Sequence, residues 1–174
     1  MELREININD KDILYDLYEE VVSNTKQNTF EGFRELGSIK DFSYEDWLND
    51  LELKKDKKNL PETYSPQINY LMLEDNYLIG VITIRWELVP ILLYYGGNIG
   101  YMIRPSKRKH GYGKKMLNLL LEEKVRGKLD KVLVTCMKDN EASKKLIESS
   151  GGIFDNEVYV KEEGCIYLRY WIYL

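Results

Sequence analysis

The chain has 174 residues, of which 44% are apolar and 31% are charged, and its formal net charge at pH 7 is −4. This length and composition predict one soluble globular domain, residues 1–174, with a single sizeable core. The acidic balance argues against a broad nucleic-acid-binding surface, because such a surface usually makes a domain basic overall.

The N-terminal third predicts one strand and two helices. The segment ELREINI, residues 2–8, has the composition of a short strand, and Asn9 or Asp10 is expected to cap the helix that follows. Apolar residues then recur at helical spacing over residues 13–22. A second helix is expected to begin at the cap Ser43. Its expected inward-facing residues are Tyr44, Trp47, Leu48 and Leu51. The polar residues 54–67 predict a loop.

The middle of the chain changes to a strand pattern. Asp75 and Asn76 predict a hairpin turn, and Gly96 and Gly97 predict a second tight turn. The strands expected around these turns are residues 68–74, 76–88 and 94–105.

The C-terminal part predicts two helices and three strands. A helix is expected to begin with GYGKKMLNLLLEE, from residue 111, and to end near Gly127, and a second helix has Asn140 as its cap. KVLVTCM, residues 131–137, predicts a strand buried on both faces. The last two strands are expected near residues 153–160 and 165–174. The order β-α-α-β-β-β-α-β-α-β-β predicts an α/β (mixed α+β) fold, with a mixed, mostly antiparallel sheet of about seven strands and about four helices.

One basic segment opposes the net charge of the chain. Residues 104–115 hold six Lys or Arg residues and the only histidine, His110, with no Asp or Glu among them. The segment lies where a strand ends and a helix begins, and the first turn of a helix has free backbone N–H groups and a positive dipole end. Gly111 and Gly113 lack a Cβ, so a phosphate can approach the main chain closely. The segment therefore predicts a phosphate-binding site.

Two common phosphate-binding patterns do not fit this segment. A P-loop needs a glycine where Arg108 stands and Ser or Thr where Lys115 stands. A dinucleotide-binding fingerprint needs a third glycine where Met116 stands, and the preceding strands are not in βαβ order.

The pattern R-x-x-G-x-G, residues 108–113, follows a strand that ends in IRP and resembles the signature of the GNAT superfamily of N-acetyltransferases. A second segment, DNEASKKLIESSGG, is similar to the N-x-x-[AS] helix of that family. GGNIGYMIRPSKRKHGYG resembles a bacterial GNAT subgroup of acetyltransferases with undefined substrates. The resemblance implies a GNAT-like acetyltransferase domain over residues 1–174, with acetyl-CoA as co-substrate.

The resemblance also implies roles for particular residues. Ile103 would offer main-chain groups to the pantetheine arm, which requires neighbouring strands to splay apart there, for instance at a bulge. Asn140 would contact the pantetheine or the thioester, or serve as a helix cap, and the two roles are compatible. Ser143 and Lys144 are cofactor contacts or plain exposed helix residues. The backbone amides expected to hold the pyrophosphate belong to Arg108, Lys109, His110, Gly111, Tyr112, Gly113 and Lys114.

Acetyl transfer to an amine needs a base more than it needs an acid. An amine with a pKa near 10.4 is protonated at pH 7, which costs roughly 4–5 kcal/mol, whereas a thiol pKa of roughly 8.5 makes the thiolate a good leaving group. Glu87 is our candidate base, and a solvated strand-end carboxylate is the alternative interpretation. Ile147 stands where many family members place a tyrosine acid. The thiolate then leaves unassisted, another tyrosine serves, or the protein does not catalyse; we expect the first.

The remaining reactive side chains are assigned simpler roles. His110 lies inside the basic segment and is expected to add positive charge there. Cys136 and Cys165, the only cysteines, lie outside any C-x-x-C or His/Cys cluster. We therefore expect no metal, reduced thiols and a cytoplasmic location, with Cys136 as a small buried apolar residue. The charged start MELREININD predicts no signal peptide, and no apolar run approaches the roughly 18 residues of a membrane span.

The expected function is N-acetyl transfer from acetyl-CoA to a primary amine, in a small molecule or a peptide. The alternative is an acyl-CoA-binding sensor or regulatory module without turnover. We expect neither nucleic acid nor membrane as a partner. The last strand, CIYLRYWIYL, is apolar on both faces. It is therefore expected to be covered by the N-terminal helices or by a second subunit in a homodimer.

Overall fold

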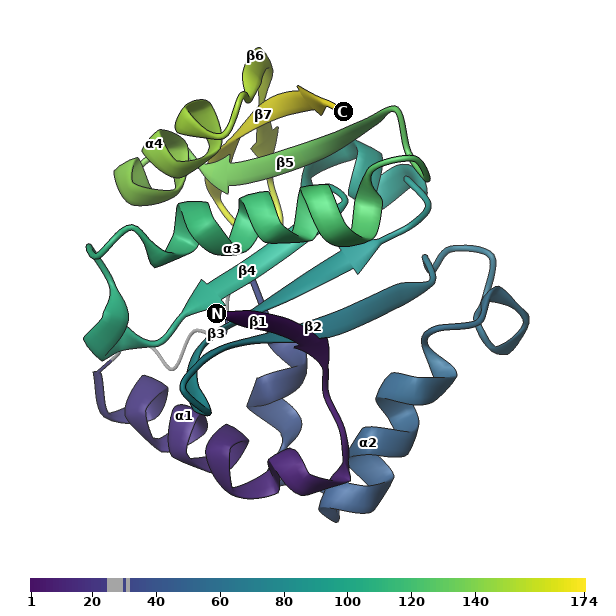
Figure 1. The fold of residues 1–174 in the computed structure, drawn as a ribbon. Coiled ribbons are helices and arrows are strands. Elements are labelled where there is room, and N and C mark those ends of the chain that lie inside the picture. Colours follow the sequence, from purple (N-terminus) through teal and green to yellow (C-terminus); the bar gives the residue numbers. More distant parts are fainter. Residues whose placement is uncertain (25–29, 31) are drawn as a thin grey trace.

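The structure is a computed structural model that describes residues 1–24, 30 and 32–174, and within these residues seven strands form one sheet (Figure 1). The strand order is β1-β2-β3-β4-β5-β7-β6, and β4–β5 is the parallel pair in an otherwise antiparallel sheet. The strands are β1 (Glu2–Glu5), β2 (Gln67–Glu74), β3 (Tyr77–Arg85), β4 (Ile99–Ile103), β5 (Lys131–Met137), β6 (Ile153–Val160) and β7 (Cys165–Tyr173). The predicted fold class and element order are confirmed.

Four main helices cover the two faces of the sheet. Helices α1 (Lys11–Asn24) and α2 (Tyr44–Leu53) lie on one face, and α3 (Tyr112–Leu120) and α4 (Glu141–Ser149) lie on the other (Figure 1). Each pair of helices encloses its own cluster of buried apolar residues. Ser43 caps α2 as predicted, because its side chain accepts a hydrogen bond from the Asp46 amide at 3.1 Å.

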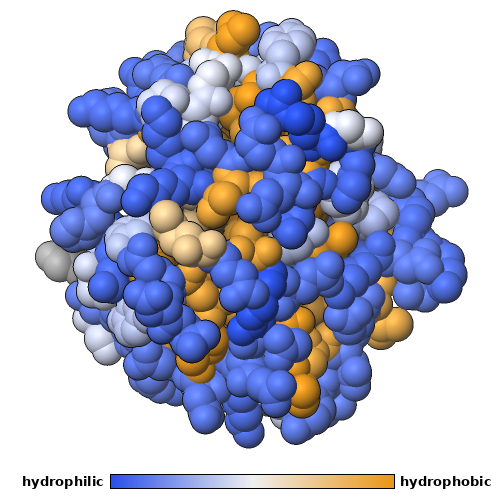
Figure 2. All heavy atoms as spheres, in the orientation of Figure 1, coloured by the Kyte–Doolittle hydropathy of each residue, from blue (hydrophilic) through white to orange (hydrophobic). Residues whose placement is uncertain are grey.

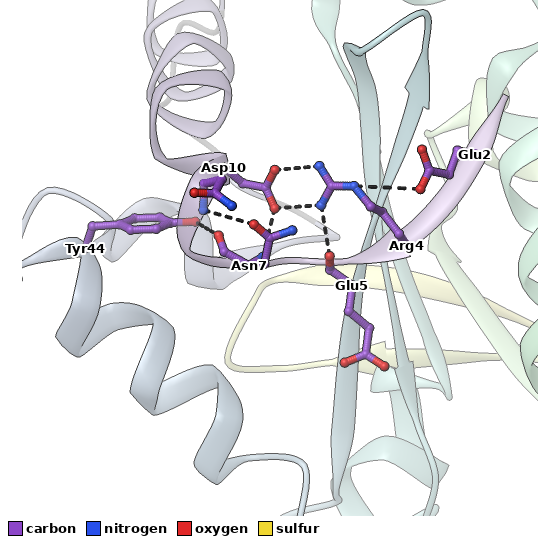
Figure 3. A network of polar contacts seen from close by, with 7 residues as sticks. Glu2, Arg4, Glu5, Asn7, Asp10 and Tyr44 are labelled. Carbon is purple, nitrogen blue, oxygen red and sulfur yellow. Dashed lines mark hydrogen bonds and ion pairs between the residues drawn. The ribbon is translucent and has the colours of Figure 1, made fainter.

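Helix α1 begins at Lys11, directly after the predicted cap position Asp10, but a short 3-10 turn, Ile8–Asp10, precedes it and is capped one turn earlier than predicted. Asn7 is the cap, and the Asp10 carboxylate accepts a hydrogen bond from the Asn7 amide at 2.8 Å, because a short 3-10 turn precedes α1. Figure 3 shows Asp10 facing Arg4 on β1, with two contacts of 2.6 and 2.7 Å. The Tyr44 hydroxyl of α2 donates to the Asn7 carbonyl at 2.7 Å. This network fixes β1, α1 and α2 against one another, and the hydrogen bond to Asp10 raises the pKa of Arg4.

The two predicted turns differ in outcome. Asp75 and Asn76, with φ values of 50° and 64°, form the tight β2–β3 hairpin as expected. The β3–β4 connection is instead helical, with a π-helical stretch at Leu92–Gly96, so the expectation of a strand from residue 94 is wrong. Pro90 favours this outcome, since a first-turn residue needs no backbone N–H. Gly97, with φ of 67°, follows the stretch.

One face of the last strand is covered by its own half of the molecule, whereas Tyr173 on the other face is 62% exposed. Leu168, Tyr170 and Ile172 are buried in the cluster beneath α3 and α4. On the other side, the Tyr167 ring lies 5.2 Å from the Tyr95 ring of the π-helical stretch. The described residues of the α1–α2 cluster include no residue of β7, so the expected cover by the N-terminal helices is wrong.

The surface gives no large apolar area on the face seen in Figure 2. Hydrophilic residues dominate that face, and the hydrophobic groups that show lie in separate patches. In the part of the chain that the structure describes, no helix is both long and apolar enough to cross a bilayer.

Candidate functional site

The parallel strands β4 and β5 separate soon after they meet. In the described chain they share one ladder pair, Ile99 with Val134, although β4 continues to Ile103 and β5 to Met137. Figure 1 shows the two arrows diverging toward their C-terminal ends, with α3 crossing in front. We call residues 100–103 and 135–137 the splayed ends. No register shift is recorded in either strand, so a bulge is not the cause.

Alternate residues of β4 bond to β3, and this alternation shows which main-chain groups of β4 face the space between β4 and β5. The Arg104 amide donates to the Ile79 carbonyl at 2.9 Å, which marks a bonded pair between β4 and β3. Bonded and non-bonded pairs alternate along an antiparallel ladder. The main-chain groups of Tyr101 and Ile103 therefore point away from β3 and toward β5.

Alternate residues of β5 likewise bond to its antiparallel neighbour β7. The Lys138 amide donates to the Ile166 carbonyl at 2.8 Å, so even-numbered residues of β5 bond to β7. The main-chain groups of Thr135 and Met137 consequently face β4. Both splayed ends thus turn backbone donors and acceptors toward the space between them, where the Ile103 carbonyl accepts from Arg108 Nε.

Asn98 holds the closed end of the splay. Its amide donates to the Leu133 carbonyl at 2.7 Å, its Oδ1 accepts from the Leu133 amide at 2.8 Å, and its Nδ2 donates to the Arg85 carbonyl at 2.8 Å. A side-chain oxygen therefore replaces a main-chain ladder acceptor just before the strands part. Asn98 is 2% exposed and joins β3, β4 and β5 at one point.

The glycine turn, residues 108–113, joins β4 to the start of α3. Lys109 and Gly111 have φ values of 64° and 79°, and Gly111 is the N-cap residue of α3 without a side-chain cap. A Cβ on Gly111 would meet nothing within 4 Å, so the first amides of α3 are open to a ligand. A Cβ on Gly113 would lie 2.3 Å from Leu146 Cδ1 of α4. The first glycine thus serves the backbone conformation and the second serves the approach of α3 to α4.

The basic residues around this turn have different surroundings. Arg108, Lys109, His110 and Lys114 are exposed, and Arg108 Nε donates to the Ile103 carbonyl at 3.1 Å. Arg104, counted in the basic segment, is instead buried and paired with carboxylates of α1. The field at the turn therefore comes from fewer cations than the sequence suggested.

Helix α4 closes the splay on one face. Asn140 is the N-cap of α4, because its Oδ1 accepts from the Ser143 amide at 3.1 Å. The Ser143 hydroxyl is hydrogen-bonded to the Tyr101 hydroxyl of β4. Burial raises the pKa of Tyr101, so its phenol stays protonated near neutral pH. Ile147 is fully buried in the core and Lys144 is half-buried.

The opposite face of the splay carries one carboxylate, Glu163, and two tyrosines. Thr135 Oγ1 donates to the Tyr95 carbonyl at 2.6 Å, which places the π-helical stretch over β5. Beside it, Glu163 accepts from Arg34 at 3.2 Å and from the Tyr167 hydroxyl at 2.6 Å. Although burial opposes the change, hydrogen bonds from Tyr167 and Arg34 hold the pKa of Glu163 below its ordinary value. Sequence reasoning missed this group, because its members are far apart in the chain.

Glu87 lies just beyond the end of β3. Its carboxylate is 3.1 Å from Lys57 Nζ, and its amide donates to Ser65 Oγ at 2.9 Å. Among the described contacts, none joins Glu87 to the splayed ends. Its side chain is 47% exposed, as expected of a strand-end carboxylate.

Cys136 is 5% exposed on β5, and burial raises the pKa of its thiol to about 11. A raised thiol pKa lowers the thiolate fraction, to about one thousandth at pH 8. We expect iodoacetamide at pH 8 to leave Cys136 unmodified in the folded protein and to modify it in urea, as read by peptide mass spectrometry. Its rate in the folded protein should rise about tenfold per pH unit from pH 8 to 10. Equal rates in folded and unfolded protein at pH 8 contradict this burial.

Comparison with known proteins agrees with this geometry. The family model described as "Acetyltransferase (GNAT) domain" matches residues 1–153. The chain therefore belongs to the GNAT family, the acetyl-CoA-dependent N-acetyltransferases. No curated protein matches the sequence significantly.

Solved structures share the fold at low sequence identity. An acetyltransferase from Salmonella typhimurium, which modifies the N-terminal serine of ribosomal protein L7/L12, has 18% identity and a TM-score of 0.69, with 99% of this chain and 94% of that chain covered. RimL, a ribosomal L7/L12 alpha-N-protein acetyltransferase in complex with coenzyme A disulfide-bonded to a cysteine, has 18% identity and a TM-score of 0.71, covering 99% and 93%. The Vibrio cholerae spermidine N-acetyltransferase SpeG has 15% identity and a TM-score of 0.59, covering 99% and 95%.

Proposed function

We propose that this protein transfers an acetyl group from acetyl-CoA to a primary amine by direct attack of the amine on the thioester. The observation that carries the proposal is the single-pair junction of β4 and β5 beside the glycine turn. An acyl-CoA needs two things from a protein: donors for its diphosphate and main-chain partners for its amide-containing arm. The glycine turn offers the first, and the splayed ends offer the second.

The placement described above supports each proposed coenzyme contact. The amides of residues 108–114 hold the diphosphate, and exposed cations around them add attraction within a Debye length of about 8 Å. The main chain of Ile103 binds the arm. Asn140 and Ser143, at the first turn of α4, contact the arm or the thioester from the other wall, and Lys144 lies one residue further along.

The acceptor enters from the face with the Glu163 carboxylate. Glu163 and the Tyr167 ring form an aromatic surface with a carboxylate that suits an amine, which would share or replace the Arg34 partner of Glu163. A small-molecule or peptide amine is therefore the proposed acceptor class, and relatives that acetylate a protein N-terminus or spermidine support it. Glu87 remains a proposed base, which must first leave its ion pair with Lys57.

Binding and turnover test this proposal separately. Acetyl-CoA at about 100 times its Kd should stabilise the folded state by about 2.7 kcal/mol, which raises the Tm by roughly 5–10 °C. A panel of primary amines, screened for release of free CoA thiol, should then identify an acceptor. A thermal shift without CoA release from any amine supports the non-catalytic acyl-CoA sensor instead. Absence of a shift refutes both functions.

A further inference from the structure

Arg104 ends β4 in a buried ion-pair network. Its side chain is 3% exposed, and Nε donates to the Leu78 carbonyl at 2.8 Å. Nη1 lies 2.7 Å from the Asp16 carboxylate and 3.0 Å from the Glu20 carboxylate, both on α1. A guanidinium held in this way does not reach a ligand in solvent. It fixes the middle of α1 against the end of the strand that leads into the glycine turn.

Glu20 differs from Asp16 in touching the turn segment itself. One oxygen of Glu20 pairs with Arg104, and the other accepts from the Ser106 amide at 2.6 Å. Ser106 lies in the 3-10 turn Pro105–Lys107, directly before the glycine turn. The Glu20 side chain is 19% exposed, whereas the Asp16 side chain is 65% exposed and has no contact with residues 105–113 among the described hydrogen bonds.

We propose that Glu20 is a positioning residue for the coenzyme diphosphate, acting through the Ser106 amide while Arg104 holds its carboxylate in place. This inference rests on the proposed function, because it concerns the same turn. An anion at the glycine turn needs several amides converging on one point. If the hydrogen bond at Ser106 holds the start of the glycine turn in place, its amides already converge before the ligand binds. Less conformational entropy is then lost on binding.

The test compares two ligands and two neighbouring carboxylates. We would measure Kd by calorimetry for CoA and for S-acetylpantetheine, which has the arm and the thioester but no diphosphate. Glu20→Ala should raise the Kd for CoA about tenfold and leave that for S-acetylpantetheine within twofold of wild type. Asp16→Ala, the matched control, removes an ion pair with Arg104 but no contact with the turn, and should leave both values within twofold. Glu20→Gln keeps one acceptor oxygen and should weaken CoA binding about threefold.

Three results would overturn the positioning role: unchanged CoA binding by Glu20→Ala, equal weakening of CoA and S-acetylpantetheine, or equal weakening by Asp16→Ala. If Glu20→Ala does not fold, Glu20→Gln decides, and a wild-type Kd for CoA then overturns the role. A wild-type protein that binds neither ligand overturns the proposed function itself, so the two failures are distinguishable.

Discussion

Replacing Gly111 with valine is expected to weaken acetyl-CoA binding about 30-fold. Gly111 has φ of +79°, a conformation that a β-branched residue strongly disfavours, so the turn must change shape. The open space around its Cβ position means that backbone conformation, and not a clash, is the cause. Loss of the helix N-terminus as an anion site removes up to about 2 kcal/mol, which is about 30-fold in Kd. Calorimetry with acetyl-CoA measures the effect.

Gly127 is a matched control for this substitution. It has φ of +80°, nothing within 4 Å of its Cβ position, and lies in the turn before β5. Gly127→Val should therefore lose similar stability while binding acetyl-CoA like the wild type. If Gly111→Val and Gly127→Val have the same Kd for acetyl-CoA, whether both bind like the wild type or both bind more weakly, the glycine turn is not the diphosphate site.

Replacing Gly32 with alanine is expected to lower the free energy of unfolding by about 3–5 kcal/mol. A Cβ on Gly32 would lie 1.9 Å from the carbonyl oxygen of Tyr101, a splayed-end residue, and φ at Gly32 is +85°. The overpacking and the left-handed conformation each cost roughly 1–3 kcal/mol. In a chain of this size the Tm should fall by roughly 10 °C, as measured by circular dichroism.

Gly151 separates the two contributions in this prediction. Its φ is +91°, but nothing lies within 4 Å of its Cβ position. Gly151→Ala should cost only the conformational term, about 1–2 kcal/mol. If Gly32→Ala is no more destabilising than Gly151→Ala, Gly32 does not pack on Tyr101 of β4 as described.

Most elements of the fold could be predicted from signals within a few residues of each other in the sequence. The hairpin at Asp75 and Asn76 and the cap at Ser43 were predictable, because each depends on side chains within a few residues. The π-helical stretch at Leu92–Gly96 was missed, because Gly96 and Gly97 suggest a tight turn, whereas Pro90 favours the start of a helix there. The cap at Asn7 was missed, because it belongs to a short 3-10 turn before α1, in which Asp10 is the N3 residue of a capping box and not the cap.

The candidate site was only partly accessible from sequence. The glycine turn lies within one short segment, so its position between β4 and α3 was predicted. Two ion pairs, Arg104 with Glu20 and Arg34 with Glu163, join residues that are far apart in the chain. No local sequence pattern predicts such pairs. Asn98 also looks like an ordinary turn residue until its contact with Leu133 across the sheet is seen.

The most direct test of this account is a crystal structure of the protein with bound CoA. The diphosphate oxygens should lie about 3 Å from backbone nitrogens of residues 108–114, with the pantetheine arm between the splayed ends of β4 and β5. CoA bound at any other place on the molecule, with the amides at the start of α3 facing only solvent, would contradict it.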